Sequence, residues 1–207
     1  MNLQELLKSY ENKGNSNYNK PNFFQLKDDG DNALVKILLK DEQDIMKFTK
    51  EVHMVKINGY DNKVECLGQG KCRCCDAGLP KKLVLMMPLY NAETKQVELW
   101  QRGITMIKDL VTMLDEYGDL SQETFKIVRS GKAKSKDTKY SMVYSKKQVE
   151  CDKTNADAPA LVGRDFKLVL GLSPEQQEEA ILEGTVTWTK KEQVATVEND
   201  ESAFKIT

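Results

Sequence analysis

Cysteine and histidine are the residues of this chain with the clearest capacity for chemistry, because they gather in one short stretch. Four of the five cysteines, Cys66, Cys72, Cys74 and Cys75, fall within ten residues, and His53, the only histidine, precedes them. Adjacent cysteines and an odd total fit a disulfide framework poorly. Clustered thiols beside an imidazole are instead typical of a metal site.

The spacing of these residues predicts a ligand set of one histidine and three cysteines. Twelve residues separate His53 from Cys66, five separate Cys66 from Cys72, and two separate Cys72 from Cys75. A C-x2-C turn holds one ion from a tight loop, and Zn²⁺ takes four such ligands tetrahedrally. Cys74 competes for a place, but its C-x-C spacing is geometrically poorer, so we interpret it as a spare thiol. The alternative is a set of reduced, metal-free cysteines with a surface histidine.

The predicted Zn²⁺ is structural rather than catalytic. A catalytic zinc keeps an open position for water and has a general base beside it. Four strong ligands fill the tetrahedron here, and the chain has no second histidine to act as that base. The deaminase pattern, H-x-E followed by P-C-x-x-C, fails because Val55 and Lys71 stand at the Glu and Pro positions. We therefore expect one structural Zn²⁺ and no enzymatic activity.

Periodic patterns predict the elements that must position these ligands. The alternating segment 45–57 predicts a strand that carries His53 on the same face as Ile45, Val55 and Ile57. A helical stripe of Ile104, Ile107, Leu110, Val111 and Leu114 predicts a core-packed helix after Gly103. Further strands are expected at 33–39, 83–90, 96–102, 124–129 and 139–145, and further helices at 3–13 and from Ser173-Pro174.

This order of elements predicts a mainly β protein with added helices. The pattern alone fits several small barrels. Among them the commonest candidate with such an order is the oligonucleotide-binding (OB) fold, here a five-stranded OB barrel with an inserted structural zinc subdomain. A length of 207 residues suits one core with extensions. We expect an N-terminal arm with a short helix at 1–21, the core at 22–184 with the zinc subdomain around 53–82, and a tail at 185–207.

Composition and charge narrow the class of protein. With 40% hydrophobic and 30% charged residues, a wholly disordered chain is excluded. The longest apolar run, LVLMMPL at 83–89, is far shorter than the roughly 20 residues of a membrane span. No signal-peptide pattern begins the chain, so we expect a cytoplasmic protein without a membrane partner. Residues 1–150 carry 25 Lys and Arg against 21 Asp and Glu, whereas residues 151–207 carry 6 against 11. This asymmetry favours a polyanion as the partner of residues 1–150.

Basic and aromatic residues in the same strands and loops indicate which polyanion this is. A protein that holds a nucleic-acid strand without reading its sequence needs cations for phosphates and aromatic faces for bases. Trp100 and Arg102 share a face of one predicted strand, and Tyr140, Met142 and Tyr144 share a face of another. The alternative to nucleic-acid binding is a structural role, in which the lysines are solvated surface charges and the aromatic rings pack in the core. The candidate nucleic-acid residues are Lys36, Lys81, Lys82, Trp100, Arg102, Arg129, Lys132, Lys134, Lys139 and Tyr140.

Four stretches of the sequence resemble a known family. They read DDGDNALVKILL, VHMVKINGYDNKVECLGQGKCRCC, LVLMMPLYNAETKQVELWQRGITMIKDL and TFKIVRSGKAKSKDTKYSMVY. Over roughly residues 23–145 the chain is similar to the zinc-containing single-stranded DNA-binding proteins of T-even-type and related tailed phages. The resemblance implies an OB barrel with zinc held by His53, Cys66, Cys72 and Cys75. It also implies that the protein coats single-stranded DNA, independently of sequence, in phage DNA replication, recombination and repair, in the host cytoplasm.

The resemblance further implies roles for single residues and for the termini. It matches Lys36 to a basic residue in the DNA groove and Tyr140 to an aromatic residue at the DNA. It also implies that the C-terminal tail recruits replication or recombination proteins. The tail of this chain is only mildly acidic, whereas the family's is long and acidic. The N-terminal arm of this chain mixes Lys with Glu, whereas that of the family is strongly basic. The spacing from the second to the third metal ligand is also shorter than in the family. Two other classes remain: a zinc-knuckle module for protein–protein interaction or regulation, and a metalloenzyme acting on nucleic acid.

Overall fold

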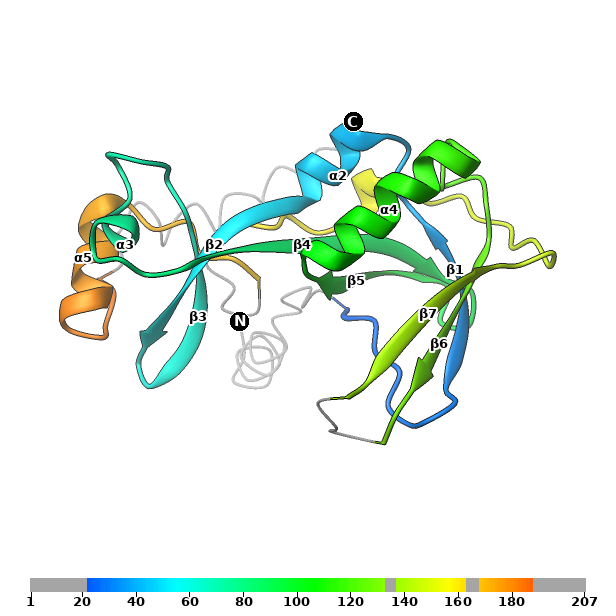
Figure 1. Ribbon diagram of the computed structural model, residues 1–207, viewed down its shortest axis with the longest axis horizontal. Coiled ribbons are helices and arrows are strands. Elements are labelled where there is room, and N and C mark those ends of the chain that lie inside the picture. Colours follow the sequence, from blue (N-terminus) through cyan, green and yellow to red (C-terminus); the bar gives the residue numbers. More distant parts are fainter. Residues whose placement is uncertain (1–21, 133–136, 163–167, 188–207) are drawn as a thin grey trace, which may run out of the picture. The chain divides into compact units, whose positions relative to one another are not determined.

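The protein is described here by a computed structural model, in which the described residues are 22–132, 137–162 and 168–187 (Figure 1). The chain forms two compact units. Their described residues are 22–40, 87–100, 119–132 and 137–159 for the first unit, and 41–86, 101–118, 160–162 and 168–187 for the second. The arm expected at 1–21 and most of the tail expected at 185–207 lie outside the described residues.

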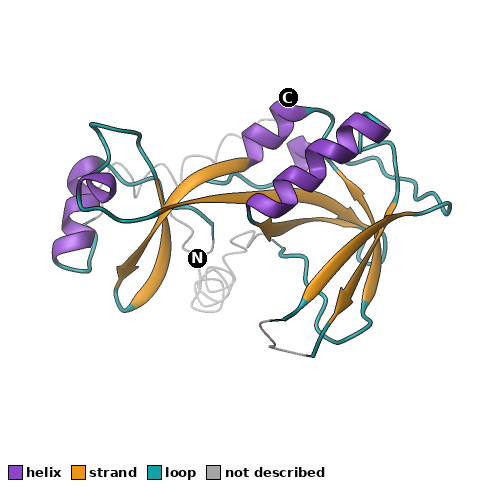
Figure 2. Ribbon diagram, in the orientation of Figure 1, coloured by secondary structure: helices purple, strands orange, loops and turns teal. Residues whose placement is uncertain are grey.

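The first unit is built on antiparallel strands (Figure 2). In it, β1 lies between β4 and β6, and β6 pairs with β7. Fully buried Val35, Ile37, Leu89, Leu99 and Phe125 form much of its core. Both β4 and β5 run on into the second unit. The bounds are β1 Asn32–Ile37, β4 Lys81–Asn91, β5 Gln96–Arg102, β6 Phe125–Ser130, β7 Lys139–Tyr144 and a 3-10 turn at Asn155–Asp157.

The second unit combines a short antiparallel sheet with four helices. Strand β2 lies between β3 and the beginning of β4. A core of Val55, Ile57, Val64, Leu170 and Leu172 packs together with two buried cysteines. Helices α3 and α5 lie side by side next to β2 (Figure 1). The bounds are α2 Glu42–Phe48, β2 Thr49–Ile57, β3 Tyr60–Glu65, α3 Arg73–Asp76, α4 Ile104–Tyr117 and α5 Pro174–Leu182.

The beginning of the predicted strand 45–57 is a helix in the structure. Residues 45–48 belong to α2, and β2 begins only at Thr49. The Asp41 carboxylate accepts a hydrogen bond from the Asp44 N–H at 2.9 Å and caps the helix. Acidic residues in the first turn also favour the helix over the strand. The strand prediction was wrong there because Ile45 and Phe48, both buried, fit a helical spacing of three equally well.

A tight turn that the pattern analysis overlooked joins β2 to β3. Only Asn58 and Gly59 separate the strands, and Ile57 pairs with Tyr60 across the turn. Their φ angles are 52° and 83°, as a two-residue hairpin turn of the primed type requires. Asn-Gly is the strongest short-range signal for this turn. The hairpin matters for the site below because β2 carries His53 and β3 leads into Cys66.

Most of the remaining elements agree with the sequence. The predicted strands near 33–39, 83–90, 96–102, 124–129 and 139–145 are confirmed, and Ser173 caps α5 as predicted. The helix after Gly103 is confirmed as α4, although only Leu110 of its stripe is fully buried and Ile104 is 54% exposed. No helix among the described residues combines the length and apolar character needed to span a bilayer.

The fold class is confirmed as mainly β with added helices. The pairing path β3-β2-β4-β1-β6-β7 has β5 as a branch on β4. It ends at β3 and β7, and no pairing among the described residues joins these two strands. The sheet is therefore open here, and the structure does not confirm a closed five-stranded barrel.

Gly59→Ala should weaken the β2–β3 hairpin. Its φ of 83° lies in the left-handed region, where a Cβ is repelled by its own backbone. No other atom lies within 4 Å of the added Cβ, so backbone strain alone should act. We expect the free energy of unfolding to fall by about 1 to 2 kcal/mol in urea denaturation. Asn58→Gly is the control, because glycine accepts a φ of 52° without strain; equal losses in both variants would contradict this turn.

Candidate metal centre and nucleic-acid interface

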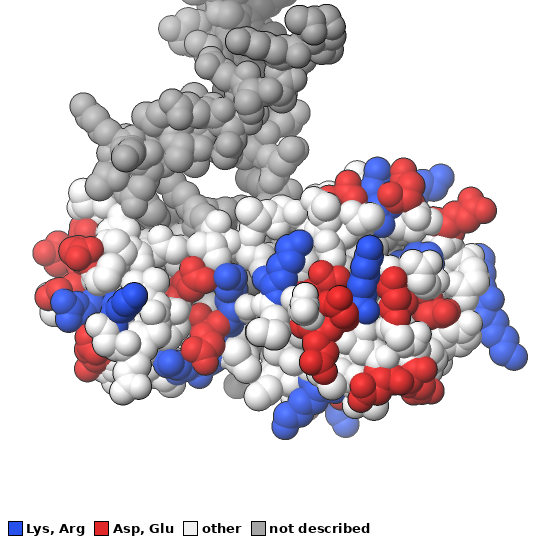
Figure 3. Space-filling model, turned by 90° about the horizontal axis from the view of Figure 1, so that it is seen from above, with Lys and Arg blue, Asp and Glu red and all other residues white. Residues whose placement is uncertain are grey.

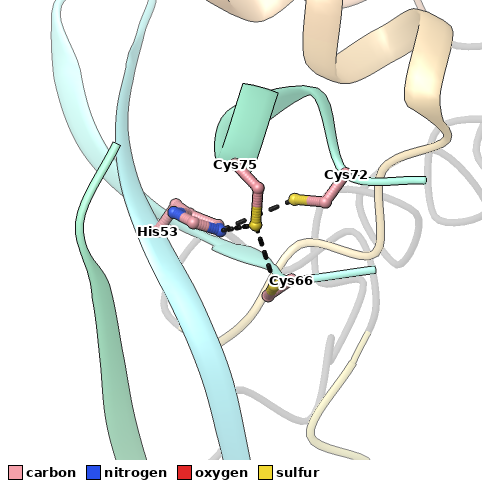
Figure 4. Close-up of side chains that lie close together, drawn as sticks. All are labelled: His53, Cys66, Cys72 and Cys75. Atoms are coloured by element: carbon pink, nitrogen blue, oxygen red, sulfur yellow. Dashed lines mark hydrogen bonds between the residues drawn. The ribbon is translucent and has the colours of Figure 1, made fainter. Parts of the chain in front are cut away.

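The four predicted metal ligands come together from three segments of the second unit. His53 lies in the middle of β2, and Cys66 directly follows β3. Cys72 is the N-cap of α3, and Cys75 lies within α3. Figure 4 shows their side chains pointing toward one another. Their ligand atoms, the imidazole nitrogen and three sulfurs, all lie within 4.8 Å of one another.

Three of the six distances between these atoms are close to the edges of a tetrahedral metal site. Nε2 of His53 lies 3.5 Å from the sulfurs of both Cys72 and Cys75, and the sulfurs of Cys66 and Cys75 are 3.6 Å apart. Around Zn²⁺, with Zn–S of about 2.3 Å and Zn–N of about 2.0 Å, tetrahedral edges are about 3.5 Å for N···S and about 3.8 Å for S···S. A disulfide, at about 2.05 Å, is far shorter. The cluster is therefore spaced for a shared metal ion.

A backbone carbonyl orients the histidine for metal binding. Nδ1 of His53 lies 3.0 Å from the carbonyl oxygen of Leu79, which can only accept a hydrogen bond. We therefore assign the proton to Nδ1, which leaves the lone pair of Nε2 facing the three sulfurs. His53 is fully buried, so this contact also satisfies its second nitrogen. Sequence reasoning missed Leu79 because a carbonyl leaves no signal in residue type.

Cys74 is separated from the ligands by its surroundings. It is fully buried and packs in the apolar core. Burial, with a smaller contribution from the charge of Cys72, raises the pKa of the Cys74 thiol to about 12. The Cys74 sulfur is not among the four ligand atoms that lie within 4.8 Å of one another. The geometry thus agrees with the interpretation of Cys74 as a spare thiol.

Without a bound metal, the thiols of Cys72 and Cys75 have pKa values shifted in opposite directions. Burial raises the pKa of Cys75 to about 12, and sharing hydrogen bonds with Cys66 and Cys72 adds to the rise. At Cys72 burial acts in the same upward direction, but backbone hydrogen bonds from Cys75 and Leu67 outweigh it and lower the pKa. A metal ion must displace the Cys75 proton, so binding releases protons and weakens as the pH falls.

Two lysines predicted to bind nucleic acid lie beside the metal centre. Lys81 pairs with His53 across β2 and β4, and Lys82 pairs with Val52. Both are exposed, and the Lys81 ammonium lies 3.4 Å from the Glu51 carboxylate. The hydrogen bond to Glu51, followed by the charges of Cys66 and Cys75, raises the pKa of Lys81. Lys81 therefore carries its positive charge next to the candidate ligand set.

The first unit holds most of the other candidate nucleic-acid residues. Lys36 is 9% exposed, and its ammonium donates to the carbonyl oxygens of Ser121 at 3.3 Å and Gln122 at 2.8 Å. It borders a hollow of about 440 Å³ that also contains Lys40 and Lys153. Glu150 and Asp152 line the same hollow, so its charge is mixed.

Aromatic rings form a row on one face of this unit. The rings of Phe24 and Trp100 meet edge to face at 5.4 Å, and those of Trp100 and Tyr140 at 5.3 Å. Phe125 and Tyr144 meet at 6.5 Å. Trp100 is 3% exposed, whereas Tyr140 is half-buried and Tyr144 is 42% exposed. The tyrosines thus present the accessible part of this aromatic row, and Trp100 lies beneath it.

Arg129 supports two loops from a buried position. It is 5% exposed, and one guanidinium nitrogen donates to the carbonyl of Lys27 at 2.7 Å. The other nitrogen donates to the carbonyl of Lys132 and the hydroxyl of Thr138, each at 3.0 Å. In this arrangement the guanidinium faces backbone acceptors rather than solvent, so its contacts are those of a structural arginine.

Strand register separates the predicted lysine in the groove from the predicted aromatic residue. Val35 lies opposite Phe125, and Phe125 lies opposite Tyr144. Because neighbours along a strand alternate in face, Tyr140 shares the face of Val35 and Lys36 lies on the other. Leu34 lies opposite Lys126, which places the exposed Lys126 on the Lys36 face. Alternation within FKIVRS would have indicated Lys126 as a further exposed cation.

The other candidates are distributed over both units. Lys132 and Lys139 are exposed on either side of the β6–β7 loop, and Lys134 lies outside the described residues. Arg102, in the second unit, is half-buried. On the face of the molecule in Figure 3, Lys and Arg alternate with Asp and Glu, and neither sign forms a continuous patch. The structure thus gathers the metal ligands, but it does not gather all ten nucleic-acid candidates.

Comparison with known proteins adds no relative. No model of a protein family matches the sequence, and no curated protein matches it. The functional argument therefore depends on the residues of this chain: the four ligands, the aromatic row and the lysines around the β6–β7 loop.

The metal content of Cys72→Ser and Cys74→Ala should show which of the two cysteines is a metal ligand. We expect one bound Zn²⁺ per chain in the wild type and in Cys74→Ala, and loss of most bound metal in Cys72→Ser, because the serine hydroxyl is a poor ligand. Metal content by mass spectrometry, with thermal unfolding on the same samples, checks this. Full metal content in Cys72→Ser together with its loss in Cys74→Ala would reverse the assignment.

Arg129→Met should destabilise the first unit. The substitution keeps the buried volume approximately but leaves the carbonyls of Lys27 and Lys132 without their donor. We expect the free energy of unfolding to fall by about 2 to 4 kcal/mol in urea denaturation. Lys139→Met, on the neighbouring strand and exposed, should change it by less than about 0.5 kcal/mol. Equal effects would show that the Arg129 contacts do not stabilise the fold.

Proposed function

We propose that this protein binds single-stranded DNA without sequence preference and performs no catalysis. The observation that carries the proposal is the pair of accessible tyrosines on β7, next to exposed lysines at the β6–β7 loop. Aromatic faces stack on any base, and lysines neutralise phosphates, so the combination binds a single strand without reading it. The resemblance to the zinc-containing phage proteins points to the same function.

The proposed interface follows the edge of the first unit. Strand β7 ends the pairing path, so both of its faces border the same edge. A nucleic-acid strand lying along that edge would place bases against Tyr140 and Tyr144. Its phosphates would meet Lys132 and Lys139, with Lys126 on the neighbouring strand. A duplex would bind weakly, because its paired bases do not offer their faces to the tyrosines.

Lys36, Trp100 and Arg129 take supporting roles in this proposal. All are buried, and Trp100 packs against Tyr140 and therefore fixes the orientation of that ring. Arg129 holds the base of the β6–β7 loop through Lys132 and Thr138. We propose that the direct contacts come from the tyrosines and exposed lysines, and that Trp100 and Arg129 position them. Lys36 supports the sheet from its other face through Ser121 and Gln122.

We propose that the metal is Zn²⁺ and that its role is structural. Three thiolates and one imidazole are a common closed set for Zn²⁺, and they leave no position for a reacting water. The zinc would hold β2, β3 and α3 together through the residues that ligate it. We further propose that the antiparallel strands belong to an OB-type barrel, with α4 inserted between β5 and β6 as that element order requires.

The biological setting is proposed from the resemblance alone. The protein would coat single strands during phage DNA replication, recombination and repair, in the cytoplasm of the host. Its tail would recruit replication or recombination proteins. The competing function is a zinc-knuckle module for protein–protein interaction.

Binding of a labelled oligothymidine, followed by fluorescence anisotropy, tests the proposal. We expect the Zn²⁺-loaded protein to bind the oligothymidine and to bind a duplex of equal length much more weakly. The logarithm of the binding constant should fall by about 0.7 per neutralised phosphate for each tenfold rise in salt. Folded, metal-loaded protein that binds neither nucleic acid would favour the protein-interaction module.

Tyr144→Leu should weaken this binding specifically. Loss of one stacked base corresponds to about 1 to 3 kcal/mol, or about five-fold to 150-fold in affinity. Tyr60→Leu is the matched control, because Tyr60 is 76% exposed but lies at the β2–β3 turn, outside the aromatic row. Equal affinities of the two variants would remove the β7 edge from the interface.

A further inference from the structure

A buried glutamine of α5 links the two segments that carry the cysteine ligands. Gln177 is 1% exposed. Its Nε2 donates to the carbonyl oxygen of Glu65 at 3.1 Å, and its Oε1 accepts from the backbone N–H of Arg73 at 3.0 Å. Glu65 immediately precedes Cys66, and Arg73 immediately follows Cys72. We propose that Gln177 is a positioning residue of the metal centre, which sets the separation between these two ligand segments.

The chemistry of the two backbone groups fixes the orientation of the amide. A carbonyl oxygen can only accept and a peptide N–H can only donate, so turning the amide over would oppose like groups on both sides. Gln177 therefore has one arrangement that satisfies both contacts. In a buried position, losing either contact leaves a polar group without a partner, which strongly disfavours other arrangements.

The helix start at Cys72 explains why such a residue is needed from outside. Cys72 is the N-cap of α3, and Arg73 is the first residue of the helix. An N-cap side chain bonds the N–H groups of the second or third helical residue, so the N–H of Arg73 needs a partner from elsewhere. The amide oxygen of Gln177 supplies that partner.

The remaining contacts show that α5 is a firm support for this task. Ser173 and Gln176 form a capping box at the beginning of α5. Ala180 packs in the same core as Cys72 and Cys74. The ion pair of Arg73 with Glu178 is longer, at 3.7 Å, and its side chains are more than half exposed, so it adds little. The buried amide is the contact that is specific to the ligand segments.

The link makes metal binding and the docking of α5 mutually dependent. If α5 orders the ligand segments, an ion that orders them must in turn favour docked α5, because coupling free energies are reciprocal. The chain that follows α5 is tied to the same helix, since Glu179 accepts hydrogen bonds from the N–H and hydroxyl of Thr187. This inference depends on metal binding by the cluster and not on the proposed binding of DNA.

Co²⁺ affinity of the full-length chain tests the proposal, read from its visible ligand-field bands in competition with a chelator. We expect Gln177→Met to bind Co²⁺ about tenfold to 100-fold more weakly than the wild type, the range typical for residues that orient metal ligands. Gln176→Met is the matched control. Gln176 is the neighbouring buried glutamine, and its side chain bonds Ser173 and Thr187. Because it contributes only to the capping box of α5, Gln176→Met should weaken Co²⁺ binding much less than Gln177→Met.

Wild-type affinity in Gln177→Met would overturn the proposal, and so would an equal loss in both variants, which would indicate a general effect of α5. If Gln177→Met does not fold, Gln177→Glu replaces it. The glutamate keeps the length and the acceptor for Arg73 but sets an oxygen against the Glu65 carbonyl, so weaker Co²⁺ binding is expected and unchanged binding overturns the proposal. A wild type that binds no Co²⁺ would overturn the metal centre itself, while DNA binding would still be decided by the anisotropy experiment.

Discussion

The requirement that four ligand atoms meet at one point governs the second unit. His53 must face inward from β2, Cys66 must directly follow β3, and Cys72 must lie at the beginning of the short helix α3. The Asn-Gly turn, the carbonyl of Leu79 and the amide of Gln177 each satisfy one of these demands. A helix of four residues such as α3 has little stability of its own, so α5 and, in the proposed metal centre, the ion would supply it.

In the first unit, buried side chains support the exposed edge formed by β7 and its tyrosines. Arg129 fixes the loops around the β6–β7 hairpin, and Trp100 packs beneath Tyr140. These residues are buried and held by several contacts, which orders the rings above them, and an ordered ring loses less entropy on binding. The accessible tyrosines and lysines then offer chemistry that suits a flexible polyanion.

Residue types and spacings predicted the ligand set, since four soft ligands suit Zn²⁺ and the C-x-C spacing of Cys74 is geometrically poorer than the C-x2-C spacing of Cys72 and Cys75. They also predicted most strands. Burial was harder to foresee: alternation tells which residues share a face but not which face is covered, so Trp100 and Arg129 looked accessible while both are buried. The helix over 45–48 competed with a strand pattern, and the contacts of Leu79 and Gln177 depend on segments distant in sequence.

X-ray absorption spectroscopy of the Zn²⁺-loaded protein tests the central claim most directly, because it counts the atoms bound to the metal. The account predicts three sulfurs at about 2.3 Å and one nitrogen at about 2.0 Å, from Cys66, Cys72, Cys75 and His53. Four sulfurs would mean that Cys74 displaces the imidazole. That result, or a shell containing oxygen from water, would contradict the closed metal centre from which the rest of the account is built.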